Sequence, residues 1–341
     1  MAAPVSMSAA LALLLAASAS LASGTALEAL EALEALEVRE VRPPAAPLIR
    51  SADFPYGVAP MPLGVDRTDS SPGRLQIVGG KDAAPGEFPW MVSMQVMIPN
   101  TLWLGSAPQH ICGGSLVAPG WVLTAAHCVW GVPQRSLRVD VVLGITNLAL
   151  ANMTEGMQRI TVTRMFAHSK YDHYRAGSIG PYDIAMLKLA REAKLSDTVK
   201  LVPLLVTISE ADQSGVATLS GWGSTSEDGN NPSYPNKLQK AQFPVVAYQD
   251  CVEFVRKQDK DAVELLAPTN LCVGPLDATG LSSCSGDSGG PLVMDIDGQT
   301  MQVGVVSWGL VNCGSFPFPS VFTRVAAHSD WIAAVQRRFK D

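Results

Sequence analysis

After Ile77 the chain is a succession of short β-rich runs, separated by turns rich in Gly, Pro, Asn and Asp. The runs are Trp90–Val96, Gly114–Val117, Trp121–Thr124, Leu137–Leu143, Gln158–Phe166, Ile184–Lys188, Ala217–Gly221, Pro291–Met294, Val303–Trp308 and Val321–Arg324. Regularly spaced short strands predict an all-β barrel or sandwich. One strong helical pattern remains, over His328–Arg338. Its Trp331, Ile332 and Val335 share one face at helical spacing, so this helix should dock on the body.

The composition fits a loop-rich secreted β protein. Hydrophobic residues make up 47% of the chain, enough for a sizeable core, whereas charged residues make up only 16% and the net charge is -6. Lys and Arg are scattered and form no basic run interleaved with aromatics, which argues against a nucleic-acid partner. The six cysteines are an even number, which suits three disulfides in an oxidising compartment. None lies in a C-x-x-C pair, so zinc binding is not expected, and no acidic loop supports a calcium site.

The first 22 residues have the pattern of a secretory signal peptide. Residues 7–22 are an apolar run that ends in small residues, with cleavage expected after Ala22 or Ala26. No Lys or Arg precedes the run, which departs from the usual pattern. A membrane anchor is the alternative, but the run is short and rich in Ala and Ser. The sequence therefore favours a signal peptide over residues 1–22.

Residues 23–76 are expected to be a propeptide and a Pro-rich linker. A Leu-Glu-Ala repeat runs from residue 27 to Glu37. A strict period of three drifts around a 3.6-residue helix and leaves no clean apolar stripe. We therefore favour a low-complexity expansion without a role over a propeptide helix. Residues 42–74 are rich in Pro and Gly, which predicts an extended linker ahead of a domain over residues 77–341.

Three motifs carry a histidine, an aspartate and a serine in that order. They are Thr124-Ala125-Ala126-His127-Cys128, Asp183-Ile184-Ala185-Met186-Leu187 and Gly286-Asp287-Ser288-Gly289-Gly290-Pro291. A serine hydroxyl is a poor nucleophile until a base takes its proton, and the base must be held by a third group. His110, His168 and His173 could each be offered as the base, but only His127 lies beside a cysteine in an apolar context. Asp140 and Asp172 are competing acids, but neither directly precedes an alternating apolar strand.

On these motifs the chain resembles the chymotrypsin/trypsin-like family of serine endopeptidases, from Ile77 to the C-terminus. The resemblance implies two six-stranded antiparallel β-barrels with an active site in the cleft between them and a C-terminal helix. It implies that Ser288 attacks the scissile carbonyl, that His127 moves the proton and that Asp183 orients the imidazole. It also implies an oxyanion hole formed by the backbone N–H groups of Gly286 and Ser288.

The resemblance further implies an activation step before Ile77. Cleavage there frees an α-amino group that pairs with Asp287, whose buried carboxylate would otherwise be costly. Pairing would order the loop that carries the nucleophile. Gln76 departs from the Arg or Lys that the family usually has before the cut. A cut after Arg74 would leave two extra residues, so either the activator has another specificity or a trimming step follows.

Three disulfides are implied by the resemblance, although spacing alone leaves 15 connectivities for six cysteines. The pairs are Cys112–Cys128, Cys251–Cys272 and Cys284–Cys313. A further bridge common in the family is absent, because its two positions hold Ala217 and Met294.

The residues expected around the substrate predict cleavage after large apolar side chains. Ser282 should lie at the base of the primary pocket, where it supplies no charge for Arg or Lys. Ser307-Trp308-Gly309 should form one wall and pair with the substrate backbone. Gly309 leaves the mouth open, and Ser320 on the far wall is neutral and only slightly narrowing. Together these substrate-binding residues suit Phe, Tyr, Leu or Met.

Three segments leave alternatives open. Gly314–Pro319 is about one residue longer than usual, and its Phe316 or Phe318 either intrudes on the pocket or faces solvent. Val96–Ile111 and Val252–Leu271 look like long loops. They either restrict specificity or are neutral length variation.

The expected protein is secreted and extracellular, has no cofactor, and acts as a monomer without nucleic-acid or membrane partners. Its expected partners are protein or peptide substrates, an activating protease and protein inhibitors. Asn152-Met153-Thr154 is a sequon, which predicts a glycoprotein. The alternative is a non-catalytic homologue that serves as a binding or scaffolding module. Retention of the whole constellation argues against it, whereas Gln76 is the one feature in its favour.

Overall fold

The computed structural model describes residues 37–41, 80–99, 106–132, 138–173, 179–207, 214–226, 231–276, 280–309, 313–314 and 317–340. The expected signal peptide, the Gln76–Ile77 junction and Phe316 lie outside these ranges. Within them, no helix has both the length and the apolar character needed to cross a bilayer.

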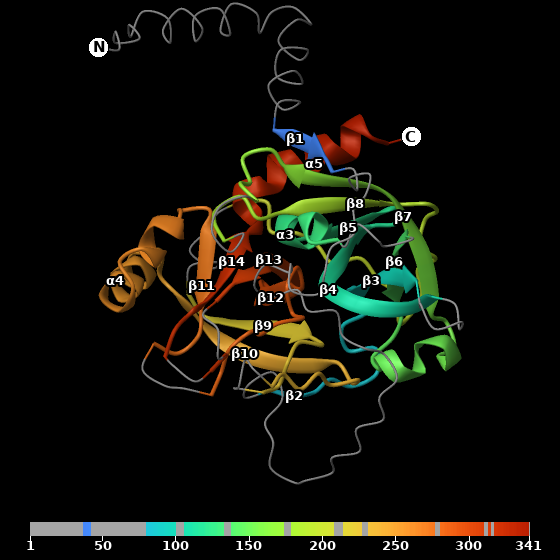
Figure 1. Ribbon diagram of the computed structural model, residues 1–341, viewed down its shortest axis with the longest axis horizontal. Coiled ribbons are helices and arrows are strands. Elements are labelled where there is room, and N and C mark those ends of the chain that lie inside the picture. The colour runs from blue at the N-terminus through green and yellow to red at the C-terminus, as the bar shows by residue number, and fades with distance from the viewer. Residues whose placement is uncertain are drawn as a thin grey trace, which may run out of the picture.

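Six antiparallel strands close the first barrel. They are β3 (Met91–Pro99), β4 (Ser106–Ala118), β5 (Trp121–Thr124), β6 (Arg138–Leu143), β7 (Gln158–His168) and β8 (Ala185–Leu189). The hydrogen-bonded order is β7-β6-β3-β4-β5-β8, and pairing of β7 with β8 closes the ring. These are the teal and green strands of Figure 1.

Six more antiparallel strands close the second barrel. They are β9 (Val216–Gly221), β10 (Gln239–Val246), β11 (Asn270–Val273), β12 (Pro291–Ile296), β13 (Gln299–Trp308) and β14 (Ser320–Arg324). Their order is β11-β14-β13-β12-β9-β10, closed by pairing of β11 with β10. The predicted pair of six-stranded antiparallel barrels is confirmed.

Each barrel also carries one short appended strand. β1 (Val38–Glu40) pairs with β7, and β2 (Lys81–Asp82) pairs with β10. β1 comes from the segment expected to be propeptide, where no packed structure was predicted. Residues ahead of the body therefore complete an edge of the first barrel.

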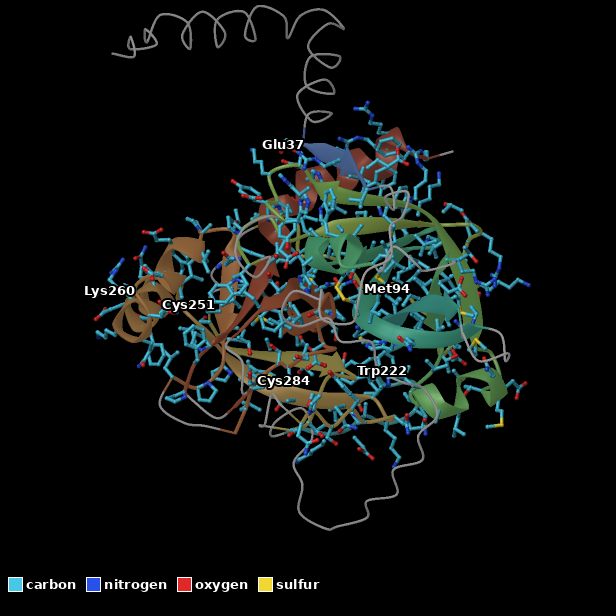
Figure 2. The ribbon with its side chains drawn as sticks, in the orientation of Figure 1. Glu37, Met94, Trp222, Cys251, Lys260 and Cys284 are labelled. Carbon is cyan, nitrogen blue, oxygen red and sulfur yellow. A yellow bond between two sulfur atoms is a disulfide. The ribbon has the colours of Figure 1, made fainter. Side chains whose placement is uncertain are left out.

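The C-terminal helix α5 (Ser329–Arg338) matches the prediction. Its Trp331, Ile332 and Val335 are buried and belong to the core of the first barrel. The chain therefore leaves the second barrel and packs its last helix on the first. Met94 and Trp222, labelled in Figure 2, are also fully buried.

Two segments expected to be long loops contain regular structure instead. Within Val96–Ile111, β3 continues to Pro99 and β4 begins at Ser106, so a long hairpin replaces the loop. Within Val252–Leu271, helix α4 (Tyr248–Gln258) and the 3-10 helix η4 (Ala262–Leu265) fill most of the segment.

The remaining short helices are α3 (Ala126–Trp130), η1 (Leu148–Met153) and η5 (Val325–His328). β10 and β11 also lie outside the predicted strands, although both are needed to close the second barrel.

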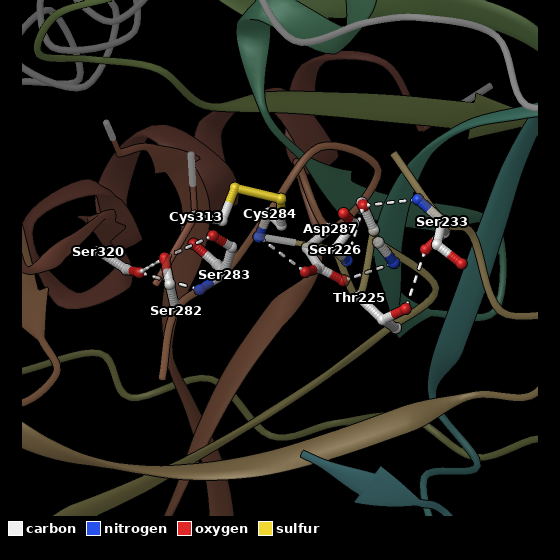
Figure 3. Close-up of a disulfide and its surroundings, with 11 residues drawn as sticks. Thr225, Ser226, Ser233, Ser282, Ser283, Cys284, Asp287, Cys313 and Ser320 are labelled. Carbon is white, nitrogen blue, oxygen red and sulfur yellow. Dashed lines mark hydrogen bonds between the residues drawn. A yellow bond between two sulfur atoms is a disulfide. The ribbon is translucent and has the colours of Figure 1, made fainter. Parts of the chain in front are cut away.

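The three disulfides form as the resemblance implied. Their Cα–Cα distances are 6.2 Å for Cys112–Cys128, 6.3 Å for Cys251–Cys272 and 5.6 Å for Cys284–Cys313. The first ties α3 to β4, the second ties α4 to β11, and the third holds the loop before β12 (Figure 3).

Candidate active site

His127 is fixed on the short helix α3, directly after β5. Ala125 is extended and turns the chain into the helix. Cys128, which directly follows His127, is anchored through its disulfide to β4. The imidazole is 11% exposed, so one part of it is accessible while the rest is packed. Helix position and disulfide together leave the ring little freedom to move.

Asp183 orients this ring. Its carboxylate accepts the backbone N–H of His127 at 2.8 Å and the Nδ1–H of the same residue at 2.7 Å. Ser307 Oγ on β13 donates a third hydrogen bond at 2.6 Å, and Thr323 Oγ1 on β14 donates to the Asp183 carbonyl at 2.7 Å. Donors from both barrels therefore hold one carboxylate that is only 1% exposed. Because the Nδ1–H points at the carboxylate, Nε2 is left as the proton acceptor.

Ser288 lies in the loop between Cys284 and β12, which packs directly on the first barrel. Its carbonyl accepts the Gly113 N–H at 2.8 Å. Gly289 has φ of 75°, and a Cβ there would lie 2.2 Å from Thr124 Oγ1. A side chain at this position is therefore excluded by both backbone conformation and space. This close approach brings the serine loop against the strand that leads into His127.

The structure brings the histidine, the aspartate and the serine loop to one place between the barrels. No hydrogen bond joins Ser288 to His127 within the described ranges. Such contacts are often long without substrate and tighten only when it binds. Neither the Gly286 N–H nor the Ser288 N–H donates to a protein acceptor among the described residues.

Asp287, which directly precedes Ser288, is fully buried. Figure 3 shows it close to Cys284. Its carboxylate accepts the backbone N–H of Gly223 at 2.8 Å and that of Cys284 at 3.0 Å. Burial raises its pKa to about 6, and these two hydrogen bonds oppose the shift without cancelling it. No basic side chain of the described ranges forms an ion pair with it. A Cβ on Gly223 would lie 2.4 Å from this carboxylate, so a residue with a side chain at position 223 would clash with Asp287.

His110 takes a role that the sequence did not reveal. It is fully buried, and burial lowers its pKa to about 4, so the ring is neutral at pH 7. Its Nε2 lies 3.1 Å from the Gly286 carbonyl, and its Nδ1 lies 2.7 Å from Ser93 Oγ. Because a carbonyl can only accept, Nε2–H is the donor and Nδ1 accepts the Ser93 hydroxyl. His110 thus holds the loop that carries Gly286 and Ser288, and its described contacts do not place it beside Asp183.

The other competing residues serve structural contacts. Burial lowers the pKa of His168 to about 4, and its ring stacks on Tyr182 with centroids 4.9 Å apart. His173 stacks on Trp130 at 3.7 Å. Asp140 accepts Arg138 Nε at 3.1 Å. None of these three is bonded to Asp183 or Ser288 in any described contact.

Ser282 and Ser320 lie side by side in the buried floor expected for the specificity pocket (Figure 3). Their hydroxyl oxygens are 3.4 Å apart, and Ser320 Oγ accepts the Ser283 N–H at 3.0 Å. A Cβ built on Gly309 would meet no described atom within 4 Å. These positions supply hydroxyl groups and open space but no charge.

Phe318 does not face solvent. It is 7% exposed and packs with Val255, Cys272 and Val321 in a buried cluster. Its ring centroid is 6.3 Å from that of Trp308. One of the two aromatic side chains of the long segment therefore packs in the buried cluster that joins α4 and η4 to the second barrel.

One group of residues has metal-ligand proximity: Cys112, His127 and Cys128. Both sulfur atoms are joined in a disulfide, so neither can supply a thiolate. The group offers no metal site.

Comparisons with known proteins agree with this geometry. The family model for trypsin matches residues 77–332. Chymotrypsin-C of Bos taurus is 36% identical over 259 residues, which cover 75% of this chain and 87% of that protein. The chain therefore belongs to the trypsin family of serine proteases.

Proposed function

We propose that this protein is a secreted serine endopeptidase, made as a zymogen, that hydrolyses peptide bonds through an acyl-enzyme. The observation that carries the proposal is the triple anchoring of Asp183 by His127 and Ser307, beside a loop that presents Ser288. A base held in one tautomer by a buried carboxylate is what an unactivated hydroxyl requires.

In the proposed reaction Ser288 Oγ attacks the carbonyl carbon of the peptide bond while His127 Nε2 takes the hydroxyl proton. The carbonyl oxygen becomes an oxyanion and accepts the N–H groups of Gly286 and Ser288. His127 then gives its proton to the departing amine, which leaves an ester on Ser288. A water molecule repeats the sequence and releases the acid, so atoms and protons balance. Asp183 stays ionised and stabilises the imidazolium.

The zymogen proposal rests on Asp287. In the proposed activation, a cut before Ile77 creates an ammonium that enters beside this carboxylate. Ionisation of Asp287 then becomes favourable, because a buried charge gains a partner. The same pair fixes the loop that carries the oxyanion N–H groups. Gln76 implies an activator that does not require Arg or Lys, or a second trimming step.

The proposed preference is for Phe, Tyr, Leu or Met before the cleaved bond. Ser282 and Ser320 offer no carboxylate to a cationic side chain, and Gly309 does not block a large one. Ser307 and Trp308 would hold the substrate backbone as an added strand on β13.

The proposed setting is extracellular. Three disulfides suit an oxidising compartment. Asn152 is exposed on η1, which leaves its side chain accessible for glycosylation. The proposed partners of the monomer are protein or peptide substrates, an activating protease and protein inhibitors.

The decisive experiment compares peptides that differ only in the residue before the cut, using protein cleaved before Ile77. Cleavage after Phe, Tyr, Leu or Met that is absent in Ser288→Ala supports enzyme and pocket together. Cleavage after Arg or Lys contradicts the proposed pocket. Folded, cut protein that hydrolyses no peptide would instead be a non-catalytic binding or scaffolding homologue.

A further inference from the structure

The last residues of strand β7, Phe166–His168, have an edge that no strand of the barrel covers. β6 pairs with β7 only from Gln158 to Thr161. Beyond that point β8 covers one side of β7, as far as Ala167. The opposite side of its last residues is covered by β1, with Val38 opposite His168 and Glu40 opposite Phe166. An uncovered strand edge exposes unpaired backbone groups, so β1 completes a surface that the body leaves unfinished.

Backbone hydrogen bonds extend beyond the strand at both of its ends. The Val41 N–H donates to the Met165 carbonyl at 3.0 Å. At the other end the Glu37 carbonyl accepts the Ser169 N–H at 2.7 Å and the Trp331 indole N–H at 3.0 Å. Because Trp331 belongs to α5, the segment is held by the strand and by the C-terminal helix at once. Figure 1 shows β1 lying beside α5.

Side chains of the segment add apolar and ionic contacts. Val41 is 6% exposed and belongs to the core cluster of the first barrel. Glu40 accepts Arg164 through both oxygens, at 3.0 and 3.1 Å, and that guanidinium lies 4.5 Å from the Phe339 ring centroid. A bidentate pair of this kind adds geometric specificity to its charge.

Glu37 makes the second ionic contact, at the start of the strand (Figure 2). Its carboxylate lies 2.5 Å from Lys170 Nζ and 3.6 Å from His168 Nε2. Glu37 and Glu40 therefore fit two separate basic groups, one at each end of β1.

No covalent bond would hold this segment once the chain is cut. All six cysteines lie between Cys112 and Cys313 and are used in the three disulfides. While the chain is intact, residues 42–76 connect the segment covalently to the body. After a cut before Ile77, only the contacts of Glu37–Val41 remain.

We propose that Glu37–Val41 stays on the edge of β7 after that cut, so that the mature protein is a non-covalent complex of two chains. The proposal rests on the proposed activation before Ile77. The occupant of the β7 edge is this chain's own upstream segment. The complex keeps the β7 edge paired and keeps Val41 in the core of the first barrel, beside Met165 of β7.

The test uses the full chain with Ser288→Ala, which prevents self-digestion. Residues 72–76 are replaced by four aspartates and a lysine, the recognition sequence of enteropeptidase, so that the cut falls before Ile77. Gel filtration and native mass spectrometry then follow the upstream fragment at roughly 10 μM protein, where a complex with a Kd of 1 μM is mostly formed. Co-elution in equal amounts is expected. Separation of the fragment from a folded body would overturn the proposal.

Variants within the segment locate the contact without changing the body. Val41→Asp places a charge in the core, and Glu40→Arg sets two guanidinium groups against each other. Each should weaken retention by at least about tenfold, which is ~1.4 kcal/mol. Arg39→Ala is the matched control, because Arg39 is exposed on the same strand. Equal retention of all three variants would contradict the contact proposed here.

Failure of this inference is distinguishable from failure of the proposed function. Retention is read as mass in the Ser288→Ala chain and needs no activity. A parallel sample with Ser288 intact reports peptide hydrolysis. A retained fragment without hydrolysis supports the two-chain complex and contradicts the proposed peptidase activity. Hydrolysis without a retained fragment supports the peptidase activity and contradicts the two-chain complex.

Discussion

The two buried aspartates of the site are held in different ways. Asp183 has three hydrogen bonds from side-chain and backbone donors of His127 and Ser307. Asp287 has two from backbone N–H groups, and burial raises its pKa to about 6. The first carboxylate is complete within the described fold, whereas the second ionises with difficulty. We call His127 with Asp183 the histidine half and Asp287 with Ser288 the serine half. The hydrogen bonds of the histidine half form within the described fold, and the raised pKa of Asp287 supports the proposal that activation acts on the serine half.

His110 sharpens this contrast. It holds the carbonyl of Gly286 as a neutral donor, so the serine loop is supported on one side by a group that carries no charge at pH 7. The loop is also held by the Gly113 N–H, which donates to the Ser288 carbonyl, and by the Cys284–Cys313 disulfide, so Asp287 is its one buried charged group. An ammonium delivered there would change the state of the loop, while the His127–Asp183 pair would stay as it is.

The largest effect should come from the histidine half. Asp183→Asn removes the charge that selects the Nδ1–H tautomer, and kcat should fall by about 10⁴-fold with KM little changed, the size known for this triad. Steady-state kinetics of the cut protein check this. Asp140→Asn is the matched control, since Asp140 is buried and ion-paired elsewhere on the first barrel. A loss below tenfold in Asp183→Asn would break the comparison.

The serine half should respond less strongly. Asp287→Asn cannot form the ion pair with a new ammonium, and kcat/KM of the cut protein should fall by about 10²–10³-fold, the value of one lost oxyanion donor. The same substitution should leave the His127–Asp183 hydrogen bond intact. The low-field proton resonance of that bond is the readout, and its disappearance would show that the two halves are not independent.

The uncut chain offers a test by pH. Asp287 has a folded pKa of about 6 against 3.8 for an exposed carboxyl, so its contribution to stability is present below pH 4 and is lost as pH rises to 6. That loss is about 3 kcal/mol. His110, His168 and His328 have lowered pKa values and act in the opposite direction over the same range.

The contribution of Asp287 is therefore read as a difference. Urea unfolding of the uncut chain and of Asp287→Asn, between pH 4 and 7, should give curves that approach each other at low pH. The variant should gain relative stability as pH rises. Parallel curves at all pH values would mean that Asp287 already has a charged partner before the cut.

The smallest effect is expected at the link between the barrels. Ser307→Ala removes one hydrogen bond to a charged carboxylate, worth about 1.5 kcal/mol, so kcat should fall roughly tenfold. Asp183 keeps its two bonds from His127. Thr323→Val is a useful companion, because that residue donates to the Asp183 carbonyl instead. Equal, large losses in both variants would assign the effect to a displacement of Asp183 relative to β13 and β14 and not to the lost carboxylate hydrogen bond.

Local patterns were sufficient for most strands and for α5. They were not sufficient for β10, whose Pro244 interrupts the strand pattern yet lies opposite Val216 in the sheet. Helix α4 contains Cys251 and extends into the segment before Cys272, where a surface loop was expected. β1 is only three residues long, and its stability comes from the β7 edge rather than from its own sequence.

The contacts that support the site could not be predicted from local sequence patterns, because they join residues far apart in the chain. His110 meets Gly286 across 176 residues, and Ser307 meets Asp183 across 124. These pairs exist only because two barrels pack together. Sequence motifs supplied the proposed reacting groups, while the residues that contact them were visible only in three dimensions.

The most direct measurement of the central claim is labelling with a serine-directed sulfonyl fluoride before and after the cut at Ile77, followed by peptide mass mapping. The account predicts a single adduct on Ser288 in the cut protein, formed at least ~100-fold faster than in the uncut chain. Equal labelling rates in the two forms, or no adduct on Ser288 in folded, cut protein, would contradict it.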